Sequence, residues 1–295
     1  MSYIAIFDII KFMKKSTKQQ RANIVNKSMF YIYKYINTNI TLEELAKLNS
    51  VSKFHFHRVF KEETKQNIFD FITSIRLQKA ANLLITNTHS TISEIANTCG
   101  YSSHSSFIKA FKSRFSYTPK DWRNQGHKEY SKFLLNEDKE FNNLDFKIEF
   151  VSKIQCAYIR HKGYNRSIKN SWQKLKALAY KYEIKDFKQV ALLHDNPTIT
   201  PLDECNYVAA IEIPKDSKLD ISTLEIPETL CAVFDLKGNY GDVLAFLRYV
   251  YHFWLPDSGY EATTLPSFVV YRKNLFLDQG DDFDLTFYLP INVIY

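Results

Sequence analysis

The sequence predicts two domains, an all-α domain with two helix-turn-helix units and an α+β domain of two β-α-β-β repeats. Three observations predict this fold class. The length of 295 residues is long for one compact domain. A helical repeat occurs in the first half at an offset of 50 residues, and a second repeat occurs in the second half at an offset of about 75. The expected boundaries are 1–24 for an N-terminal extension, 25–124 for the helical domain, 125–143 for a polar linker and 144–295 for the α+β domain.

Positive charge is concentrated in the helical half. Residues 1–125 carry 19 Lys and Arg against 8 Asp and Glu, a net charge of +11. Residues 126–295 carry 20 against 24, a net charge of −4, and the two sum to the +7 of the whole chain. A strongly basic module suits a polyanion, most simply nucleic acid. The alternative at this point is a solvated basic surface with no such partner.

Neither the cysteines nor the N-terminal segment indicates a metal, a cofactor or a membrane. The four cysteines, Cys99, Cys156, Cys205 and Cys231, include no C-x-x-C pair. The apolar segment S-Y-I-A-I-F-D-I-I-K-F-M-K-K at residues 2–15 is too short to cross a bilayer. We expect it to form an added helix that packs on the body of the protein. The sequence therefore predicts a cytoplasmic protein with reduced thiols.

Each half of the helical repeat predicts two helices joined by a turn. T-L-E-E-L-A at residues 41–46 and T-I-S-E-I-A at residues 91–96 both have the Thr-x-x-Glu spacing of a capping box. Ser52 and Ser102 then stand where a second helix would begin in each unit. Between the units, apolar residues at helical spacing over 67–85 predict one long connecting helix.

The stretch V-S-K-F-H-F-H-R-V-F-K at residues 51–61 predicts an amphipathic helix. Phe56, Val59 and Phe60 fall on the inner face. The opposite face carries Phe54, His57, Arg58 and Lys61. This mixture suits the DNA major groove, because Arg can bind guanine through two hydrogen bonds and an apolar ring can touch a thymine methyl group.

The second unit repeats the pattern, with Phe107, Ala110 and Phe111 on the inner face. The outer face carries His104, Ser105, Lys109 and Lys112. A single exposed cation on a helix is usually just solvated, but two such helices in a domain of net charge +11 favour DNA binding.

These residues carry a resemblance to a known family. G-Y-S-S-H-S-S-F-I-K-A-F-K-S-R-F-S-Y-T-P-K-D-W-R at residues 100–123 resembles the C-terminal signature of the AraC/XylS family of bacterial transcription regulators. S-K-F-H-F-H-R-V-F-K resembles the first recognition helix of its Rob and MarA branch. The resemblance implies binding to promoter double-stranded DNA, contact with RNA polymerase and a role as an activator. The DNA-binding residues that we expect are Lys53, Phe54, His57, Arg58, Lys61, His104, Ser105, Lys109 and Lys112.

Two positions depart from the family pattern. Ser50 and Lys65 stand where the family usually has glycine, in the first turn and after the first recognition helix. We expect the fold to survive with a strained or reshaped turn. Asn49 tolerates a left-handed conformation and is a candidate for that role.

The segment from residue 144 predicts the second domain. Leu144, Phe146, Ile148 and Phe150 alternate as in a strand with one buried face. C-A-Y-I-R-H-K-G-Y at residue 156 and C-A-V-F-D-L-K-G-N-Y at residue 231 then begin two similar segments, each with an amphipathic helix followed by strands. Two such halves suggest an antiparallel sheet backed by two helices, with a groove where the halves meet.

This pattern, with H-K-G-Y, H-D-N-P, W-L-P-D-S-G-Y and P-S-F-V-V-Y, resembles the GyrI-like effector-binding domain. The resemblance implies a small hydrophobic effector held in an aromatic groove. The ligand-binding residues carried over are Tyr164, Trp172, Tyr240, Trp254, Phe268, Val269 and Tyr271. Each aromatic residue among them could equally belong to the core, and only the set supports a groove.

Val269 stands where the family often has a glutamate. Without that carboxylate a buried cationic ligand would lack a counter-charge, so we expect a neutral, apolar ligand unless another acid supplies the charge. Two alternatives stay open for the second domain. One is a protein-contact module with no ligand, and the other is a small-molecule hydrolase, which Val269 and the lack of a nucleophile arrangement disfavour.

Overall fold

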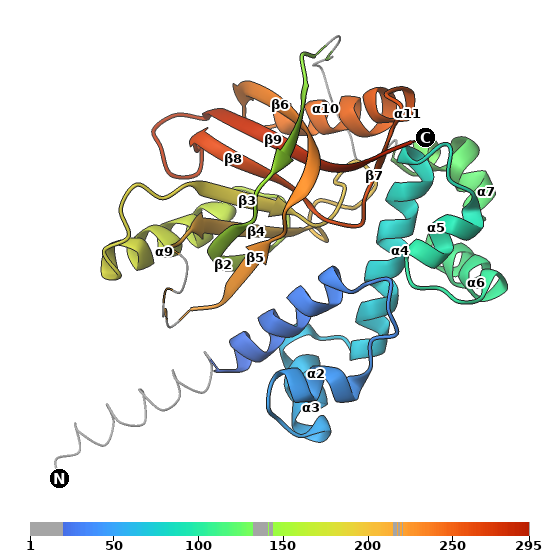
Figure 1. Cartoon of the computed structure of the whole chain (residues 1–295), viewed down its shortest axis with the longest axis horizontal. Helices are drawn as coiled ribbons and strands as arrows, with labels where there is room; N and C mark the ends of the chain where they lie inside the picture. Colours follow the sequence, from blue (N-terminus) through green and yellow to red (C-terminus); the bar gives the residue numbers. More distant parts are fainter. Residues whose placement is uncertain are drawn as a thin grey trace. The chain divides into compact units, whose positions relative to one another are not determined.

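The computed structural model describes residues 20–131, 141, 144–214, 217, 219 and 221–294. The chain divides into two compact units inside one helix, α4 (Ile68–Thr86): the first unit ends at Ile75 and the second begins at Arg76 (Figure 1). The helix expected over residues 2–15 lies outside the described residues.

In the described part of the first unit, a helix over residues 20–34 is followed by α2 (Leu42–Leu48), α3 (Lys53–Thr64) and the first half of α4. The predicted capping box opens α2. The Thr41 hydroxyl accepts a hydrogen bond from the Glu44 N–H at 3.2 Å, and the Glu44 carboxylate accepts one from the Thr41 N–H at 2.9 Å. Ser52 caps α3 by accepting from the His55 N–H. These local bonds explain why both helices begin where the sequence predicts.

The core of the first unit forms where its helices meet. Phe56, Val59 and Phe60 of α3 are fully buried in a cluster with Leu45 of α2 and Ile32 of the first helix. The inner face of α3 is thus the predicted one. Burial of these side chains turns the remaining face of α3 toward solvent.

Two residues other than glycine close the turns of the first unit. Ser50 has φ 54° and Lys65 has φ 62°, in the left-handed region that favours glycine. Asn49 has φ −100° and does not take that role; its Nδ2 instead donates to the Leu45 carbonyl and the Ser28 hydroxyl, at 2.8 Å each. Ser50 itself therefore holds the strained conformation.

In the second unit, the rest of α4 is followed by α5 (Ile92–Thr98) and α6 (His104–Phe115). The second predicted capping box is present at Thr91 and Glu94. However, α6 is capped by Ser103, whose hydroxyl accepts from the Ser106 N–H, and not by Ser102. The reason is the turn before it, which is one residue longer (99–103) than the turn before α3 (49–52).

The helical region continues into the segment 125–143 that the sequence suggested as a linker. After α6 come α7 (Pro119–Asp121), the π-helical turn η1 (Trp122–Gly126) and α8 (His127–Ser131). Trp122 is fully buried, and its ring packs on Phe111, Phe115 and Tyr130. Its indole N–H donates to the Ala81 carbonyl at 2.9 Å, which ties this segment to α4.

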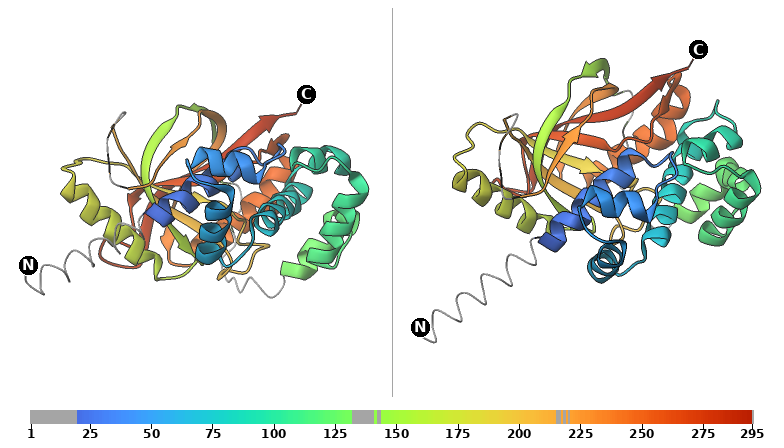
Figure 2. Two further views of the ribbon diagram at one scale, coloured as in Figure 1. Left: turned by 90° about the horizontal axis from the view of Figure 1, so that it is seen from below. Right: turned by 60° about the horizontal axis from the view of Figure 1, so that its bottom comes forward.

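The rest of the second unit is an antiparallel sheet with helices. Its elements are β1 (Lys147–Val151), β2 (Ile154–Lys162), α9 (Ile168–Lys181), β3 (Gln189–Leu193), β4 (Asn206–Glu212), β5 (Thr223–Ile226), β6 (Thr229–Asn239), α10 (Asp242–Tyr249), η2 (Val250–Trp254), α11 (Leu255–Asp257), β7 (Tyr260–Ala262), β8 (Ser267–Lys273) and β9 (Asp282–Val293). The strand order in the described residues is β1-β6-β9-β8-β3-β4-β2-β5, and β7 pairs with β9. Figure 2 shows the curled sheet from two further sides.

Two repeats, β2-α9-β3-β4 and β6-α10-β8-β9, join where β3 pairs with β8 and Val190 lies opposite Val270. Each repeat also receives the strand that precedes the other one, because β1 pairs with β6 and β5 pairs with β2. The predicted fold class, two helix-turn-helix units followed by an α+β domain of two β-α-β-β repeats, is confirmed.

Both repeat helices contribute to one core. Trp172 and Leu175 of α9, and Phe246 and Leu247 of α10, belong to a single buried cluster. The four cysteines are free and buried, and burial raises the pKa of the Cys156 thiol to about 12. This thiol therefore stays protonated.

We predict that Ser50→Gly raises the free energy of unfolding of the full chain, by up to about 1 kcal/mol. Glycine removes the steric cost of the left-handed conformation, which outweighs the flexibility that it adds to the unfolded chain. Urea denaturation followed by circular dichroism measures the change. Ser74→Gly, inside α4, is the matched control and should lower stability. A loss of stability in both variants would contradict strain at Ser50.

Candidate functional site

The outer face of α3 presents the residues that the sequence predicted for DNA binding. Exposed or half-buried on this helix are Lys53, Phe54, His57, Arg58 and Lys61. The ring of Phe54 is 80% exposed, although a ring of this size normally gains several kcal/mol by burial. The guanidinium of Arg58 lies 3.4 Å from Nδ1 of His55, its own helix neighbour. This face therefore combines an uncovered aromatic ring with cations.

The outer face of α6 is equally open. His104, Ser105, Lys109 and Lys112 are all exposed. Nδ1 of His104 lies 3.2 Å from the Ser93 hydroxyl of α5. The inner face of α6 is formed by Phe107, Phe111 and Phe115, which are buried. Ala110, predicted on the inner face, is half-buried.

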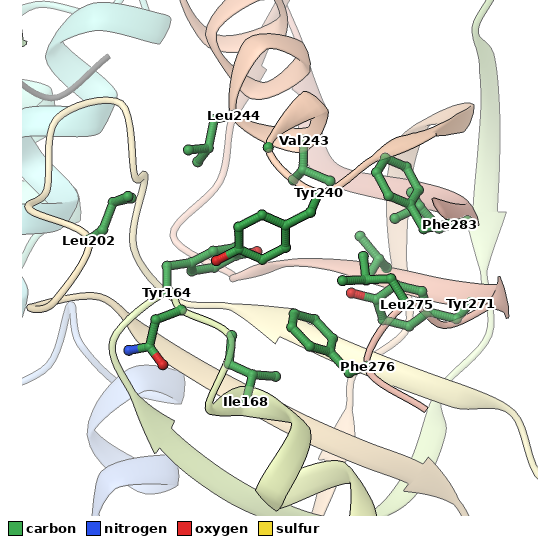
Figure 3. Close-up of a pocket in the computed structure, with 14 residues that line it drawn as sticks. Tyr164, Ile168, Leu202, Tyr240, Val243, Leu244, Tyr271, Leu275, Phe276 and Phe283 are labelled. Carbon is green, nitrogen blue, oxygen red and sulfur yellow. The ribbon is translucent and has the colours of Figure 1, made fainter. Parts of the chain in front are cut away.

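A cavity lies in the second unit between the first turns of α9 and α10 and the strands β8 and β9 (Figure 3). Its volume is about 100 Å³. An apolar cavity of about 150 Å³ can hold benzene, so a larger ligand would need this cavity to widen. The lining residues are Tyr164, Asn165, Ile168, Leu202, Tyr240, Gly241, Val243, Leu244, Val269, Tyr271, Leu275, Phe276, Phe283 and Leu285.

Three tyrosines, Tyr164, Tyr240 and Tyr271, line the cavity, and Tyr207 lies behind it in contact with Tyr271. The hydroxyls of Tyr271 and Tyr207 are 3.4 Å apart, and the indole N–H of Trp172 donates to the Tyr207 hydroxyl at 3.0 Å. Burial raises the pKa of Tyr271 to about 12 and raises that of Tyr164 well above 10. Both phenols are therefore neutral at physiological pH, and no Asp or Glu is among the lining residues described. The cavity suits an uncharged ligand with an apolar body.

Tyr240 stands at the mouth of the cavity. It is 39% exposed, and the guanidinium of Arg166 lies 4.4 Å from its ring centroid. Arg166 also donates two hydrogen bonds to the Asp281 carboxylate, at 2.8 and 3.1 Å. This bidentate pair holds the cation against the ring.

The structure brings four of the seven predicted ligand-binding residues together around the cavity: Tyr164, Tyr240, Val269 and Tyr271. Trp172 is fully buried behind the wall, with its ring 5.8 Å from that of Tyr271.

Two of the predicted residues lie elsewhere. Phe268 points to the other face of β8 and stacks on Tyr288, because neighbouring residues of a strand face opposite sides. Trp254 packs on Phe234 and Phe146. Neither lines the cavity.

Sequence reasoning missed the other ten of the fourteen lining residues, among them Leu202, Leu275 and Phe276. Leu275 and Phe276 lie in the turn after β8, which Asn274 holds by donating from its Nδ2 to Oε1 of Gln189 at 2.8 Å. An apolar run inside an otherwise polar connection, L-F-L at residues 275–277, was the available signal. Leu202 lies in the β3–β4 loop and had no such signal.

The second helix-turn-helix unit shares its core cluster with the sheet and also makes polar contacts with it. Asn87, at the end of α4, donates to the Ala262 carbonyl at 3.0 Å and accepts from the Ala262 N–H at 2.9 Å. Glu261 accepts from the N–H and the hydroxyl of Ser90, at 2.8 and 2.6 Å. Residue separations above 170 make such contacts invisible to pattern analysis.

A histidine pair lies in the same contact region. The rings of His127 and His252 have centroids 5.5 Å apart, and Nε2 of His252 lies 2.7 Å from the Thr198 hydroxyl. Burial, with a further contribution from His127, lowers the pKa of His252 to about 3. Burial also lowers the pKa of His127.

Comparisons with known proteins agree with both parts of the structure. Residues 144–291 match the model of the GyrI-like small molecule binding domain, and residues 45–125 match the model of a helix-turn-helix domain. Regulatory protein SoxS of Escherichia coli K12 is 32% identical over 102 residues, which are 35% of this chain and 94% of SoxS. The xylose operon regulatory protein of Escherichia coli K12 is 34% identical over 99 residues, which are 34% of this chain and 25% of that protein. The chain thus spans only a quarter of the length of the xylose regulator.

Solved structures are similar over parts of the chain. The C-terminal domain of AraT from Geobacillus stearothermophilus is 34% identical with a TM-score of 0.33, covering 35% of this chain and 84% of that one. The EcmrR C-terminal domain is 14% identical with a TM-score of 0.40, covering 51% of this chain and 99% of that one.

The matched residues define the class of the chain, a helix-turn-helix protein that also carries a GyrI-like domain. The chain belongs to the AraC/XylS family of regulators and carries a GyrI-like domain. Among the residues described, no helix is both long and apolar enough to span a bilayer.

We predict that the full chain loses thermal stability as the pH falls from 6.5 toward 5. His252 stays neutral in the folded state down to about pH 3, whereas an unfolded histidine binds a proton near pH 6.5. The unfolded state therefore takes up more protons below pH 6.5, which costs up to about 1.4 kcal/mol per pH unit for each such histidine. Thermal denaturation between pH 7.5 and 5 measures the slope.

His252→Gln should make this slope shallower, and His89→Gln, at an exposed position, is the matched control and should leave it unchanged. Equal slopes in all three proteins would contradict the role of His252.

Proposed function

We propose that this regulator binds promoter DNA in a sequence-specific manner through the outer faces of α3 and α6. The observation that carries the proposal is the 80% exposure of Phe54 next to Arg58 on a helix whose other face is fully buried. An uncovered ring beside a cation matches the chemistry of the major groove, with its thymine methyl groups and guanine acceptors.

Each exposed residue has a role in this proposal. Phe54, His57 and Arg58 contact base edges from α3, and His104, Ser105 and Lys109 do so from α6. The cations at helix ends and flanks, Lys53, Lys61 and Lys112, contact phosphates and give affinity without sequence information. Because one chain carries both units, a monomer can occupy two half-sites.

We further propose that the protein activates transcription by contacting RNA polymerase on the DNA. The lactose operon transcription activator of Staphylococcus xylosus, 31% identical over 107 residues, supports this direction by its name. In vitro transcription tests this role, on a promoter that carries the protein's preferred site as selected from random duplexes. A decrease in transcript on adding the protein would make it a repressor instead.

The C-terminal domain, in our proposal, senses a small, neutral, hydrophobic molecule in the tyrosine-lined cavity. We infer a neutral ligand because no carboxylate is among the described lining residues, and an unpaired buried cation costs several kcal/mol. The same absence, with Val269 at the position where the family often has glutamate, argues against a hydrolytic role.

We predict that Arg58→Ala weakens binding to the preferred site, selected from random duplexes, by about 1–3 kcal/mol and relaxes selectivity at one base pair. Lys61→Ala should weaken binding to all duplexes by a similar factor. It should also reduce the slope of the logarithm of the binding constant against the logarithm of the salt concentration by about one. Fluorescence anisotropy at several salt concentrations measures both, and Lys176→Ala on α9 is the control. If Arg58→Ala weakens every duplex equally, Arg58 contacts phosphate and not a base.

We predict that neutral hydrophobic compounds raise the thermal stability of the full chain and that matched cationic compounds do not. A ligand at a hundredfold excess over its dissociation constant adds about 2.7 kcal/mol, which a thermal-shift screen detects readily. Tyr271→Ala should abolish the effect, whereas Phe253→Ala, an exposed aromatic outside the cavity, should retain it. A flat response across the panel would favour a protein-contact module.

Val269→Glu places a carboxylate in the cavity and should transfer the response to cationic compounds. Val269→Gln, of the same shape without charge, is the matched control. A response to cations in the unsubstituted protein would show that an acid outside the cavity wall supplies the charge.

A further inference from the structure

The β3–β4 loop, residues 194–205, is unusual because its first part, residues 194–200, is polar and buried. His194, Asp195, Asn196, Thr198 and Thr200 are all less than 10% exposed. Connecting loops normally run over the surface, since buried polar groups must find partners. A buried polar loop therefore indicates a segment held by specific contacts on several sides.

On one side this loop forms part of the cavity. Leu202 lines the cavity, and its carbonyl accepts a hydrogen bond of 2.6 Å from the N–H of Tyr164, which is another lining residue. Three residues on, the Cys205 carbonyl accepts from the Gly163 N–H at 2.8 Å. A ligand that displaces Leu202 must therefore move the loop as well (Figure 3).

On the other side the loop contacts the connecting helix α4 and the second recognition helix, α6. Nδ2 of Asn196 donates to Oδ1 of Asn82 on α4 at 2.8 Å, and Gln78 on α4 donates to the Thr200 hydroxyl. Glu204 lies 3.3 Å from the guanidinium of Arg114, in the last turn of α6. One loop of twelve residues (194–205) thus contacts the cavity at one side and the helices α4 and α6 at the other.

The loop is also held together internally. Oδ1 of Asn196 accepts from the N–H and the hydroxyl of Thr198, at 2.9 and 2.7 Å. Oδ2 of Asp195 accepts from the N–H and the side-chain amide of Asn206, at 2.7 and 2.8 Å. The bonds between Asp195 and Asn206 tie the two ends of the loop together, and this bracing is the basis of the coupling proposed next.

We propose that the β3–β4 loop couples occupancy of the cavity to the second helix-turn-helix unit and leaves the first unit unaffected. The proposal rests on the proposed sensor function, because only a sensor requires such coupling. Its selectivity follows from the division of the chain: α6 belongs to the same compact unit as the cavity, and α3 does not. A ligand then changes affinity at the half-site that α6 occupies, while α3 keeps its own.

Hydrogen–deuterium exchange on the full chain tests the coupling without any ligand. Val243→Phe on α10 fills part of the cavity from a lining residue outside the loop. We expect exchange in peptides covering α6 to change by about twofold or more, a typical strength for coupling through packed side chains, with peptides covering α3 unchanged. If Val243→Phe does not fold, Leu275→Phe fills the same cavity from the turn after β8.

The control background removes the loop contacts on the helix side only, by Gln78→Ala, Asn82→Ala and Arg114→Gln together. In this background, the cavity substitution should no longer change exchange in α6. The proposal is overturned if the change in α6 persists in this background, if α6 does not respond although the cavity peptides do, or if α3 responds as strongly as α6. The exchange experiment uses no ligand, so its outcome is independent of the thermal-shift screen. If α6 responds to the cavity substitution but no compound raises the thermal stability, the sensor function is refuted and the coupling stands. If a compound binds but α6 does not respond, the coupling is refuted and the sensor function stands.

Discussion

The pairing of β3 with β8 is the constraint on which the second unit depends. Each β-α-β-β repeat taken alone would form a sheet of only three strands, close to the smallest sheet that is stable in water. The repeats solve this by pairing centrally and by exchanging their preceding strands, β1 to β6 and β5 to β2. One core cluster then runs under both repeats. The cavity lies on this junction, and the first turns of both repeat helices contribute to its wall.

The helical part was largely predictable because its determinants are local. The capping boxes at Thr41 and Thr91 use residues three positions apart, and the buried stripe of α3 follows from helical spacing. The miss at Ser102 came from turn length, which spacing within a helix does not determine. The miss at Phe268 was avoidable: residues 268 and 271 are three apart, so they cannot share a strand face, and assigning Tyr271 to the cavity excludes Phe268.

Long-range polar contacts were beyond the sequence. Asn87 binds the backbone of Ala262, and Ser90 binds Glu261, across more than 170 residues with no repeat or spacing to mark them. Such contacts make the second helix-turn-helix unit part of the body that contains the sheet, so the compact units divide inside α4. Composition placed the change of domain in the polar segment after residue 124, because a linker is recognised by polarity, whereas a compact unit is defined by contacts.

This division bears on how a chain with the two proposed DNA-binding helices, α3 and α6, would respond to a ligand. A ligand shifts an equilibrium only by its difference in affinity between two states, and the coupling is reciprocal. If the states differ in the unit that holds α6, DNA bound by α6 must in turn change ligand affinity, while DNA bound by α3 alone must not. A regulator of this kind would stay on its promoter through one helix and change its contacts through the other. The ligand would then adjust the complex on the DNA without releasing the protein.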